Sequence, residues 1–160
     1  MIVVVMGVSG VGKTTIGDAL ARELGWRFFD ADEYHPPQNV AKMAAGEALD
    51  DEDRKPWLER LNRELWQLDA RGEDAVLACS ALKEKYRRRL ADGIKRLEWV
   101  YLKGDFELID SRLARRRHRY MPASLLRSQF EALEPPQRAI VVDVAGDVAS
   151  SVDLIKRSLP

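Results

Sequence analysis

One stretch near the start of this 160-residue chain has the residue types and spacing needed to bind phosphate groups. Glycines let such a loop curl until successive backbone N–H groups point inward at an anion. A lysine then reaches the β- and γ-phosphates of a nucleotide, and a hydroxyl ligates Mg²⁺. The pattern G-x-x-x-x-G-K-[ST] is matched in full by Gly7, Val8, Ser9, Gly10, Val11, Gly12, Lys13 and Thr14. The stretch predicts a loop that binds ATP with Mg²⁺; a Gly-rich turn before an ordinary helix is the alternative.

The segments on either side of this loop agree with the first interpretation. Residues 2–6 are an apolar, β-branched run, which is typical of a buried parallel strand. Residues 14–24 carry Ile16, Leu20 and Leu24 at a spacing of four, which predicts an amphipathic helix. A strand, a Gly-rich loop and a helix in this order are the context that the phosphate-binding mechanism requires.

Two aspartates follow the next predicted strand, which covers residues 27–29. Ligands of open α/β sheets bind at the carboxyl ends of the strands. If this strand adjoins the first one, Asp30 and Asp32 face the nucleotide crevice. A carboxylate there can hold Mg²⁺ through water, or accept a proton from an alcohol that attacks the γ-phosphate. The alternative is that the aspartates only end a strand and begin a turn.

Further polar residues follow along the chain. His35, ahead of two prolines, either contacts a polar substrate or caps its turn. Arg54 and Lys55 follow directly after the acidic residues 47–53, which suit the start of a helix predicted over 56–71. The basic pair either clamps an anionic substrate or is solvated. Cys79 ends a predicted strand over 74–79 and is interpreted as a small buried core residue.

An arginine-rich segment lies near residue 116. Residues 112–119 contain five arginines, more than a surface helix needs. In a phosphoryl-transfer enzyme such a segment forms a lid that closes on the phosphates, and we expect it over residues 116–124. Arg112 and Arg116 are its candidate phosphate ligands. The alternative, a basic RNA-binding patch, is disfavoured by a net charge of zero and by the lack of interleaved aromatics other than Tyr120.

The remaining pattern predicts one α/β domain over residues 1–160. Strands over 97–102 and 139–142 complete a set of five that alternates with helices. This order predicts a three-layer P-loop kinase fold: a five-stranded parallel sheet with helices on both faces and a mobile lid. The zero net charge, the single cysteine and the lack of a signal or membrane segment predict a soluble cytoplasmic enzyme without a nucleic-acid or membrane partner.

Several segments together resemble the gluconokinase family, and the resemblance covers nearly the whole chain. They are the loop with Met6, Asp32 with 35–36, 39–43 with Gly46, 51–58, 79–83 with 86–87, 101–104, and 128–131 with 133–135. The stretches Asp51-Glu52-Asp53-Arg54-Lys55-Pro56-Trp57-Leu58 and Cys79-Ser80-Ala81-Leu82-Lys83 are far more specific than the phosphate loop. The family pattern differs at Ala31, where glycine is usual, at Ala48, where proline is common, and at 116–120, where its lid histidine position is Arg119.

The resemblance implies ATP-dependent phosphorylation of D-gluconate to 6-phospho-D-gluconate, on a fold similar to that of shikimate kinase. Arg54 and Arg87 are then the candidates for the gluconate carboxylate, since a guanidinium offers a bidentate fork. His35, Lys83 and Gln129 are candidates for its hydroxyls.

In this interpretation Asp32 accepts the proton of the attacking alcohol, and Asp30 helps to hold hydrated Mg²⁺. Lys13 and Arg116 stabilise the transferring phosphoryl group. Family members are often homodimers, which leaves a homodimer open for this chain. Two rivals stay open: a kinase for another small molecule, such as shikimate or a nucleotide, and a non-catalytic or RNA-directed P-loop protein.

Overall fold

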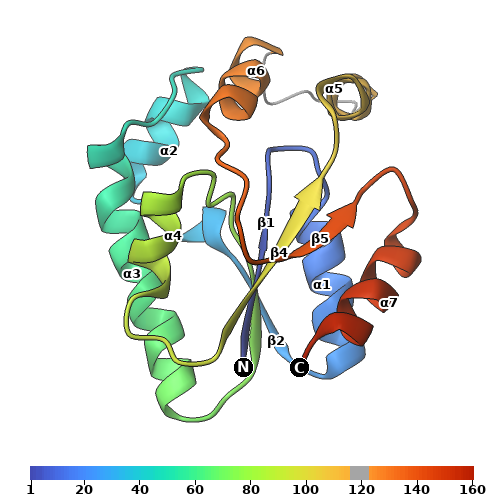
Figure 1. Ribbon diagram of the computed structural model, residues 1–160. Coiled ribbons are helices and arrows are strands. Elements are labelled where there is room, and N and C mark those ends of the chain that lie inside the picture. Colours follow the sequence, from blue (N-terminus) through green and yellow to red (C-terminus); the bar gives the residue numbers. More distant parts are fainter. Residues whose placement is uncertain (116–122) are drawn as a thin grey trace.

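The structure is a computed structural model that describes residues 1–115 and 123–160 (Figure 1). The elements in chain order are β1 (Ile2–Met6), α1 (Lys13–Leu24), β2 (Arg27–Asp30), the 3-10 helix η1 (Ala31–Tyr34), α2 (Pro37–Ala44), α3 (Asp51–Ala70), β3 (Ala75–Ala78), α4 (Glu84–Ala91), β4 (Leu97–Lys103), α5 (Phe106–Ala114), α6 (Ala123–Ala132), β5 (Ile140–Asp143) and α7 (Val148–Ser158). No helix within the described ranges is long and apolar enough to cross a membrane.

A parallel sheet forms the middle layer. Within the described residues it has five strands in the order β2-β3-β1-β4-β5, and every neighbouring pair is parallel. This confirms the predicted α/β architecture. β3 lies between β1 and β2, so β2 is not the direct neighbour of β1 that the placement of the two aspartates assumed. All the strands nevertheless end at the same edge, at the top of Figure 1.

The alternating side chains of β1 build two separate cores. Val3 and Val5 face the core beneath α1 and α7, whereas Ile2, Val4 and Met6 face the core beneath α3 and α4. Every residue of β1 is fully buried, as expected for a central strand covered on both faces. Burial of each such side chain contributes roughly 1.5–3 kcal/mol before the costs of folding are counted. The strand that leads into the phosphate loop is therefore firmly held.

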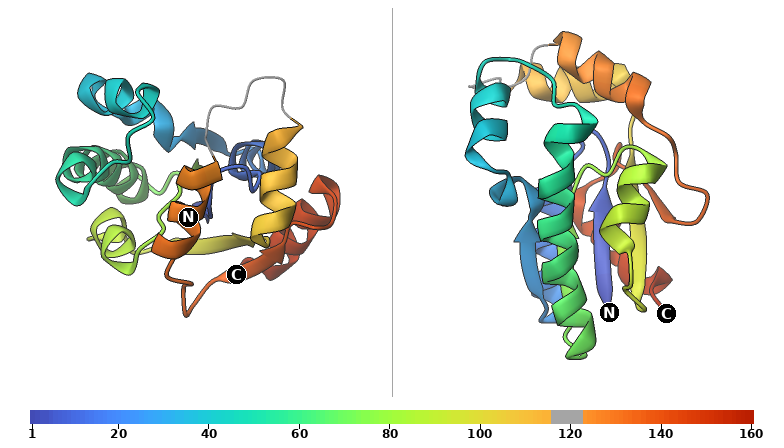
Figure 2. Two further views of the ribbon diagram at one scale, coloured as in Figure 1. Left: turned by 90° about the horizontal axis from the view of Figure 1, so that it is seen from above. Right: turned by 90° about the vertical axis from the view of Figure 1, so that its left-hand side faces the viewer.

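Two helices lie over the carboxyl edge of the sheet instead of on its faces. Figures 1 and 2 show α5 and α6 across the top, above the strand ends. They pack on each other through the edge-on pair Phe106–Phe130, whose ring centroids are 5.7 Å apart. Leu126 of α6 and Ile109 of α5 are fully buried in the same core as α1. These helices therefore roof the edge where ligands of such sheets bind.

Two helices begin at other residues than the sequence pattern indicated. α3 begins at Asp51, because Asp50 and Asp53 form a reciprocal capping box, and Pro56 lies inside the helix. The sequence pattern also indicates a helix over residues 81–91 with Ser80 as its cap; α4 begins instead at Glu84, and its N-cap residue is Lys83. Instead Glu134, distant in sequence, accepts a hydrogen bond from the Glu84 N–H at 2.9 Å. Local sequence could not show this second cap.

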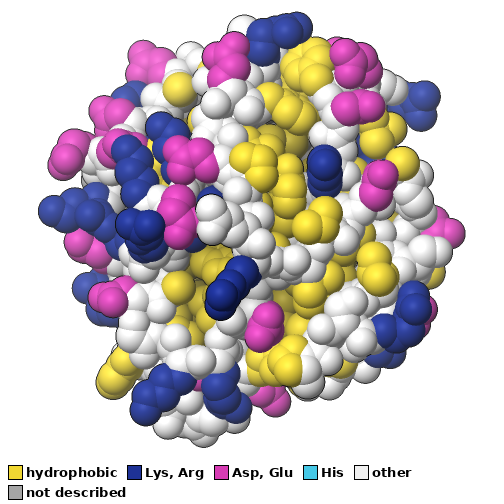
Figure 3. Space-filling model, in the orientation of Figure 1, with side chains coloured by type: hydrophobic (Ala, Val, Ile, Leu, Met, Phe, Trp, Pro, Cys, Tyr) yellow, Lys and Arg dark blue, Asp and Glu magenta, His cyan; other side chains and the backbone are white. Residues whose placement is uncertain are grey.

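The molecular surface seen in the orientation of Figure 1 carries charges of both signs. Figure 3 shows basic and acidic side chains interspersed on the left, where α3 and α4 lie, with hydrophobic side chains grouped near the middle. Such mixing agrees with the zero net charge of the chain.

Candidate active site

The phosphate loop lies between β1 and α1. Gly12 is the N-cap of α1 with φ of 103°, a left-handed conformation that favours glycine, and it has no side chain that could cap the helix. A helix N-terminus that begins after a glycine in this way is suited to bind an anion. Lys13 Nζ donates to the Val8 carbonyl oxygen at 3.0 Å, across the mouth of the loop. Gly10 lies against Leu113 of α5, so close that an added Cβ would come within 2.8 Å of that side chain.

The aspartates after β2 meet this loop despite the intervening strand. Thr14 Oγ1 donates to Asp30 Oδ2 at 3.1 Å, and the other oxygen of Asp30 accepts from the Asp32 N–H at 3.0 Å. A hydroxyl and a carboxylate are oxygen donors of the kind that Mg²⁺ prefers, and Mg²⁺ usually keeps several waters beside one or two protein ligands. Thr14 and Asp30 therefore fit a hydrated Mg²⁺ ion.

Asp32 is the more unusual of the two carboxyl groups. Its side chain still reaches solvent, but partial desolvation by the surrounding protein raises its pKa, the charge of Asp30 raises it further, and Lys13 opposes both. A carboxyl group with increased proton affinity is better suited to accept a proton than an ordinary surface aspartate. The thiol of Cys79 is buried beside the same three charges, and burial raises its pKa to about 12. Cys79 is therefore a neutral core residue, as predicted.

His35 is held as a neutral imidazole with a defined tautomer. It stacks on Trp57 with ring centroids 4.2 Å apart, and burial followed by the charge of Arg54 lowers its pKa to about 4. Asn39 Nδ2 lies 2.8 Å from the Asp53 carbonyl oxygen and 3.2 Å from His35 Nδ1. The nitrogen that faces a carbonyl must be the donor, so Nδ1 accepts and the ring proton is on Nε2. His35 thus offers an N–H donor to a ligand hydroxyl.

A basic cluster gathers around Tyr86. Arg54, in the first turn of α3, donates to the Leu49 carbonyl at 2.6 Å and to Tyr86 Oη at 3.2 Å. Its guanidinium also lies over the Tyr86 ring, 5.0 Å from the centroid, and Lys83 Nζ lies 5.9 Å from that centroid. Tyr86 in turn donates to Asp51 Oδ1 at 2.6 Å, and burial together with this bond raises the Tyr86 pKa to about 12. The structure brings Arg54 and Lys83 together, and Arg54 is close enough to His35 to lower its pKa.

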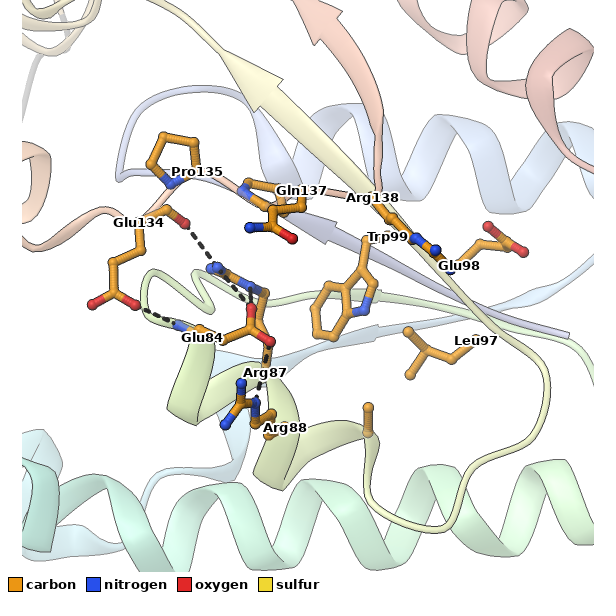
Figure 4. A pocket seen from close by; sticks show the side chains of 12 residues that line it. Glu84, Arg87, Arg88, Leu97, Glu98, Trp99, Glu134, Pro135, Gln137 and Arg138 are labelled. Carbon is orange, nitrogen blue, oxygen red and sulfur yellow. Dashed lines mark hydrogen bonds and ion pairs between the residues drawn. The ribbon is translucent and has the colours of Figure 1, made fainter.

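Arg87 is directed elsewhere. Its side chain is only 4% exposed and donates to the Ala81 carbonyl at 2.7 Å and the Glu134 carbonyl at 2.8 Å, with Glu84 as an ionic partner at 3.2 Å. Figure 4 shows the contacts of Arg87 with Glu84 and Glu134 in the wall of a hollow of about 780 Å³ between α4, β4 and residues 134–138. These contacts tie α4 to the segment after α6. They do not direct the guanidinium toward the phosphate loop.

The remaining predicted residues belong to α5, to α6 and to the segment between these two helices. Gln129 of α6 contacts Ser9 of the phosphate loop, accepting from its N–H at 2.8 Å. Arg112 of α5 donates to the carbonyl oxygen of Val144, which follows β5. Arg116 and most of the lid predicted over 116–124 lie outside the described residues.

Three residues that hold the site together had no role assigned from the sequence. Asn39 sets the His35 tautomer, and Trp57 supports the ring while its Nε1 donates to the Ala31 carbonyl at 2.7 Å. Tyr86 orients Arg54. Their signal in the sequence was that each falls within a family-like segment, and Trp57 also belongs to the apolar pattern of the helix predicted over 56–71.

Comparison with known proteins agrees with this geometry. A family model described as Shikimate kinase matches residues 9–143. The thermosensitive gluconokinase of Escherichia coli is 42% identical over 98% of this chain and 86% of its own length. The crystal structure of a gluconokinase from Sinorhizobium meliloti is 40% identical, with a TM-score of 0.87 over 95% of this chain and 87% of that one. Shikimate kinase from Aquifex aeolicus, 20% identical with a TM-score of 0.70 over 99% of this chain and 95% of that one, shares the fold.

The phosphate loop after the central strand, the parallel sheet and the carboxylates at its edge define a P-loop kinase of the shikimate-kinase type. Within this class, two relatives at 40–42% identity over nearly the whole chain narrow the assignment. The chain belongs to the gluconokinase family.

Proposed function

We propose that this chain transfers the γ-phosphoryl group of ATP to the 6-hydroxyl of D-gluconate, giving 6-phospho-D-gluconate and ADP. The observation that carries the proposal is that Thr14 of the phosphate loop donates to Asp30 at 3.1 Å, at the edge where the Lys13 ammonium acts on the Asp32 carboxyl, whose pKa is raised. The ammonium suits the phosphates and the Asp32 carboxyl suits the attacking alcohol. Membership of the gluconokinase family supports gluconate as that alcohol.

On the donor side, the loop amides and Lys13 hold the phosphates of ATP. Thr14 and, through water, Asp30 would hold a Mg²⁺ ion, which would neutralise phosphate charge. The role predicted for Arg116 is to neutralise charge on the transferring phosphoryl group. It stays a prediction because Arg116 lies outside the described ranges.

On the acceptor side, gluconate brings one carboxylate and several hydroxyls. Arg54 is our candidate for the carboxylate, because its guanidinium is oriented by Leu49 and Tyr86 and has further N–H donors. His35 Nε2–H and the Lys83 ammonium are candidates for hydroxyls. Asp32 accepts the proton of the primary alcohol as its oxygen bonds to phosphorus and ADP leaves. Arg87 is not part of this proposal, since its donors are engaged in the wall of the hollow.

A panel of acceptors with Mg·ATP and coupled detection of ADP tests the proposal. The panel holds gluconate, a second sugar acid, glucose without a carboxylate, shikimate and a nucleoside monophosphate. We expect the highest kcat/KM with gluconate, and ³¹P NMR of the product should show a phosphomonoester at carbon 6. A preference for shikimate or the nucleotide would move the chain to a rival kinase class.

Two further proposals concern the cellular location and the oligomeric state of the protein. A reaction that consumes ATP fits the cytoplasm, which we propose as its location. The homodimer left open by the resemblance also stays a proposal, and sedimentation velocity over a range of protein concentrations would decide it.

A further inference from the structure

Gln129 and Ser9 of the phosphate loop are joined by two hydrogen bonds. The Ser9 N–H donates to Gln129 Oε1 at 2.8 Å, and Gln129 Nε2 donates back to Ser9 Oγ at 3.3 Å. One amide group thus satisfies both a backbone donor and a side-chain acceptor of the same loop residue. The two residues are 120 positions apart in the chain, so the pairing is a property of the tertiary fold.

The helix that carries Gln129 is also fixed just beyond its C-terminal end, close to Gln129 itself. Just beyond α6, the Glu134 N–H donates to the Leu82 carbonyl at 2.8 Å, while the Glu134 side chain caps α4 through the Glu84 N–H. Buried Arg87 donates to the Glu134 carbonyl at 2.8 Å. α6 therefore bridges the carboxyl edge of the sheet, from the loop after β1 to the segment after β3.

The middle of α6 is held as well. Leu126 is fully buried, Phe130 packs edge-on against Phe106, and the Arg127 guanidinium lies 4.4 Å from the centroid of that same Phe106 ring. A helix anchored in this way can impose a position on a flexible, glycine-rich loop. Val8 and Val11 of the loop are buried in the same core, whereas Ser9 is only half-buried and is held by Gln129.

We infer that Gln129 is a positioning residue for the nucleotide: it fixes the Ser9 peptide and so presets the phosphate loop for ATP. This differs from its predicted contact with a gluconate hydroxyl. Oε1 and Nε2 are both directed at Ser9, which leaves one amide hydrogen and one lone pair for other partners. The inference deepens the proposed function and rests on the loop being its nucleotide site.

Direct binding of Mg·ADP to the intact protein, measured by calorimetry without any acceptor, tests the inference. Gln129→Met keeps the length of the side chain but removes both hydrogen bonds. Two neutral hydrogen bonds at ordinary strength predict a Kd for Mg·ADP weakened about 5- to 150-fold. The KM for gluconate, measured at saturating ATP, should change less than twofold. Ser128→Ala, an exposed neighbour on the same helix, is the control and should leave both values unchanged.

A second variant links the effect to Ser9. Ser9→Ala keeps the backbone N–H and loses only the Oγ contact, so it should weaken Mg·ADP binding less than Gln129→Met does. In the double variant the two effects should fall short of additive, because both remove the same Nε2–Oγ bond. A structural defect alone would lower the melting temperature, so circular dichroism and melting temperature are recorded for every variant.

The outcomes separate this inference from the proposed function. Unchanged Mg·ADP binding in Gln129→Met, with a raised KM for gluconate, would overturn the positioning role and return Gln129 to the acceptor site. Weakened Mg·ADP binding supports the inference even if gluconate proves not to be the acceptor. Effects of Ser9→Ala and Gln129→Met that add in full would contradict action through the Ser9 side chain.

Discussion

At the scale of single residues, Asp32 is distinguished by its surroundings. Partial desolvation and the neighbouring Asp30 charge raise its pKa, and Lys13 limits the rise. The substitution Asp32→Asn keeps the shape and removes the proton acceptor. Loss of a general base costs about 10²–10⁴ in rate, so kcat should fall within that span while Mg·ADP still binds. Glu33→Gln, at the next position and likewise exposed, is the matched control. A decrease in kcat below threefold would leave Asp32 without a catalytic role.

His35 predicts a pH dependence of stability. Its pKa is about 4 in the folded chain against an ordinary value of 6.5, because burial and Arg54 disfavour the imidazolium. Between these two values the unfolded chain binds more protons, so the free energy of unfolding contributed by His35 is complete above pH 6.5 and is lost as the pH falls toward 4. Urea unfolding at pH 7.5 and pH 5.0 should therefore show a lower free energy of unfolding at the acidic pH.

The variant His35→Phe isolates this contribution. It keeps a ring on Trp57 but cannot be protonated, so the difference between the two pH values should shrink. The groups nearby, Arg54 and the Lys42–Asp53 ion pair, are present in both proteins and cancel in the comparison. An equal loss of stability in variant and wild type would show that the acid sensitivity comes from other groups.

At the scale of secondary-structure elements, Arg87 joins α4 to the segment after α6. Arg87→Met would leave the Ala81 and Glu134 carbonyls without their donors. An orphaned buried acceptor costs about 1–3 kcal/mol, so we expect a decrease of that size in the free energy of unfolding by urea. Arg88→Met is the control, because the next side chain is 79% exposed and should matter by less than about 0.5 kcal/mol. A near-normal stability for Arg87→Met, with a raised KM for gluconate, would restore its predicted role as a carboxylate ligand.

The elements also show where sequence patterns suffice. The strand, loop and helix at residues 2–24 are set by local chemistry: an apolar run, glycines and a spacing of four. The predicted start of α3 was wrong by five residues. Pro56 was placed at the first position of the helix, whereas the capping box of Asp50 and Asp53 starts the helix earlier. That signal was in the acidic run but was interpreted only as general helix-start charge.

The contacts of the candidate site divide in the same way. The meeting of Thr14 with Asp30 could be expected, since parallel strands end at one edge of a sheet. The partners of Arg87 and Gln129 could not, because they depend on how the segments from α6 to residue 138 fold back on residues 8–10 and 81–84. The residue types alone allow both a ligand contact and a structural contact for such side chains.

At the scale of the whole molecule, nucleotide binding should be measurable as stability. A ligand at 100 times its Kd that binds only the folded chain adds about 2.7 kcal/mol. For a protein of this size that corresponds to a rise of roughly 5–10 °C in melting temperature. Mg·ADP should produce such a rise in a thermal scan of the wild type. Lys13→Ala removes the phosphate contact and should lose most of it; a full rise in that variant would place the nucleotide elsewhere.

The single cysteine gives this molecule an internal reporter of local opening. Only the thiolate reacts readily with alkylating reagents, and burial both covers the Cys79 sulfur and raises its pKa to about 12. Modification at neutral pH therefore proceeds only when the structure around Cys79, at the end of β3, opens locally. Because no second thiol competes, each labelled molecule records one such event at one atom. The time course of labelling then measures the rate of local opening of the structure around Cys79, close to Lys13 and Asp32, with or without bound ligands.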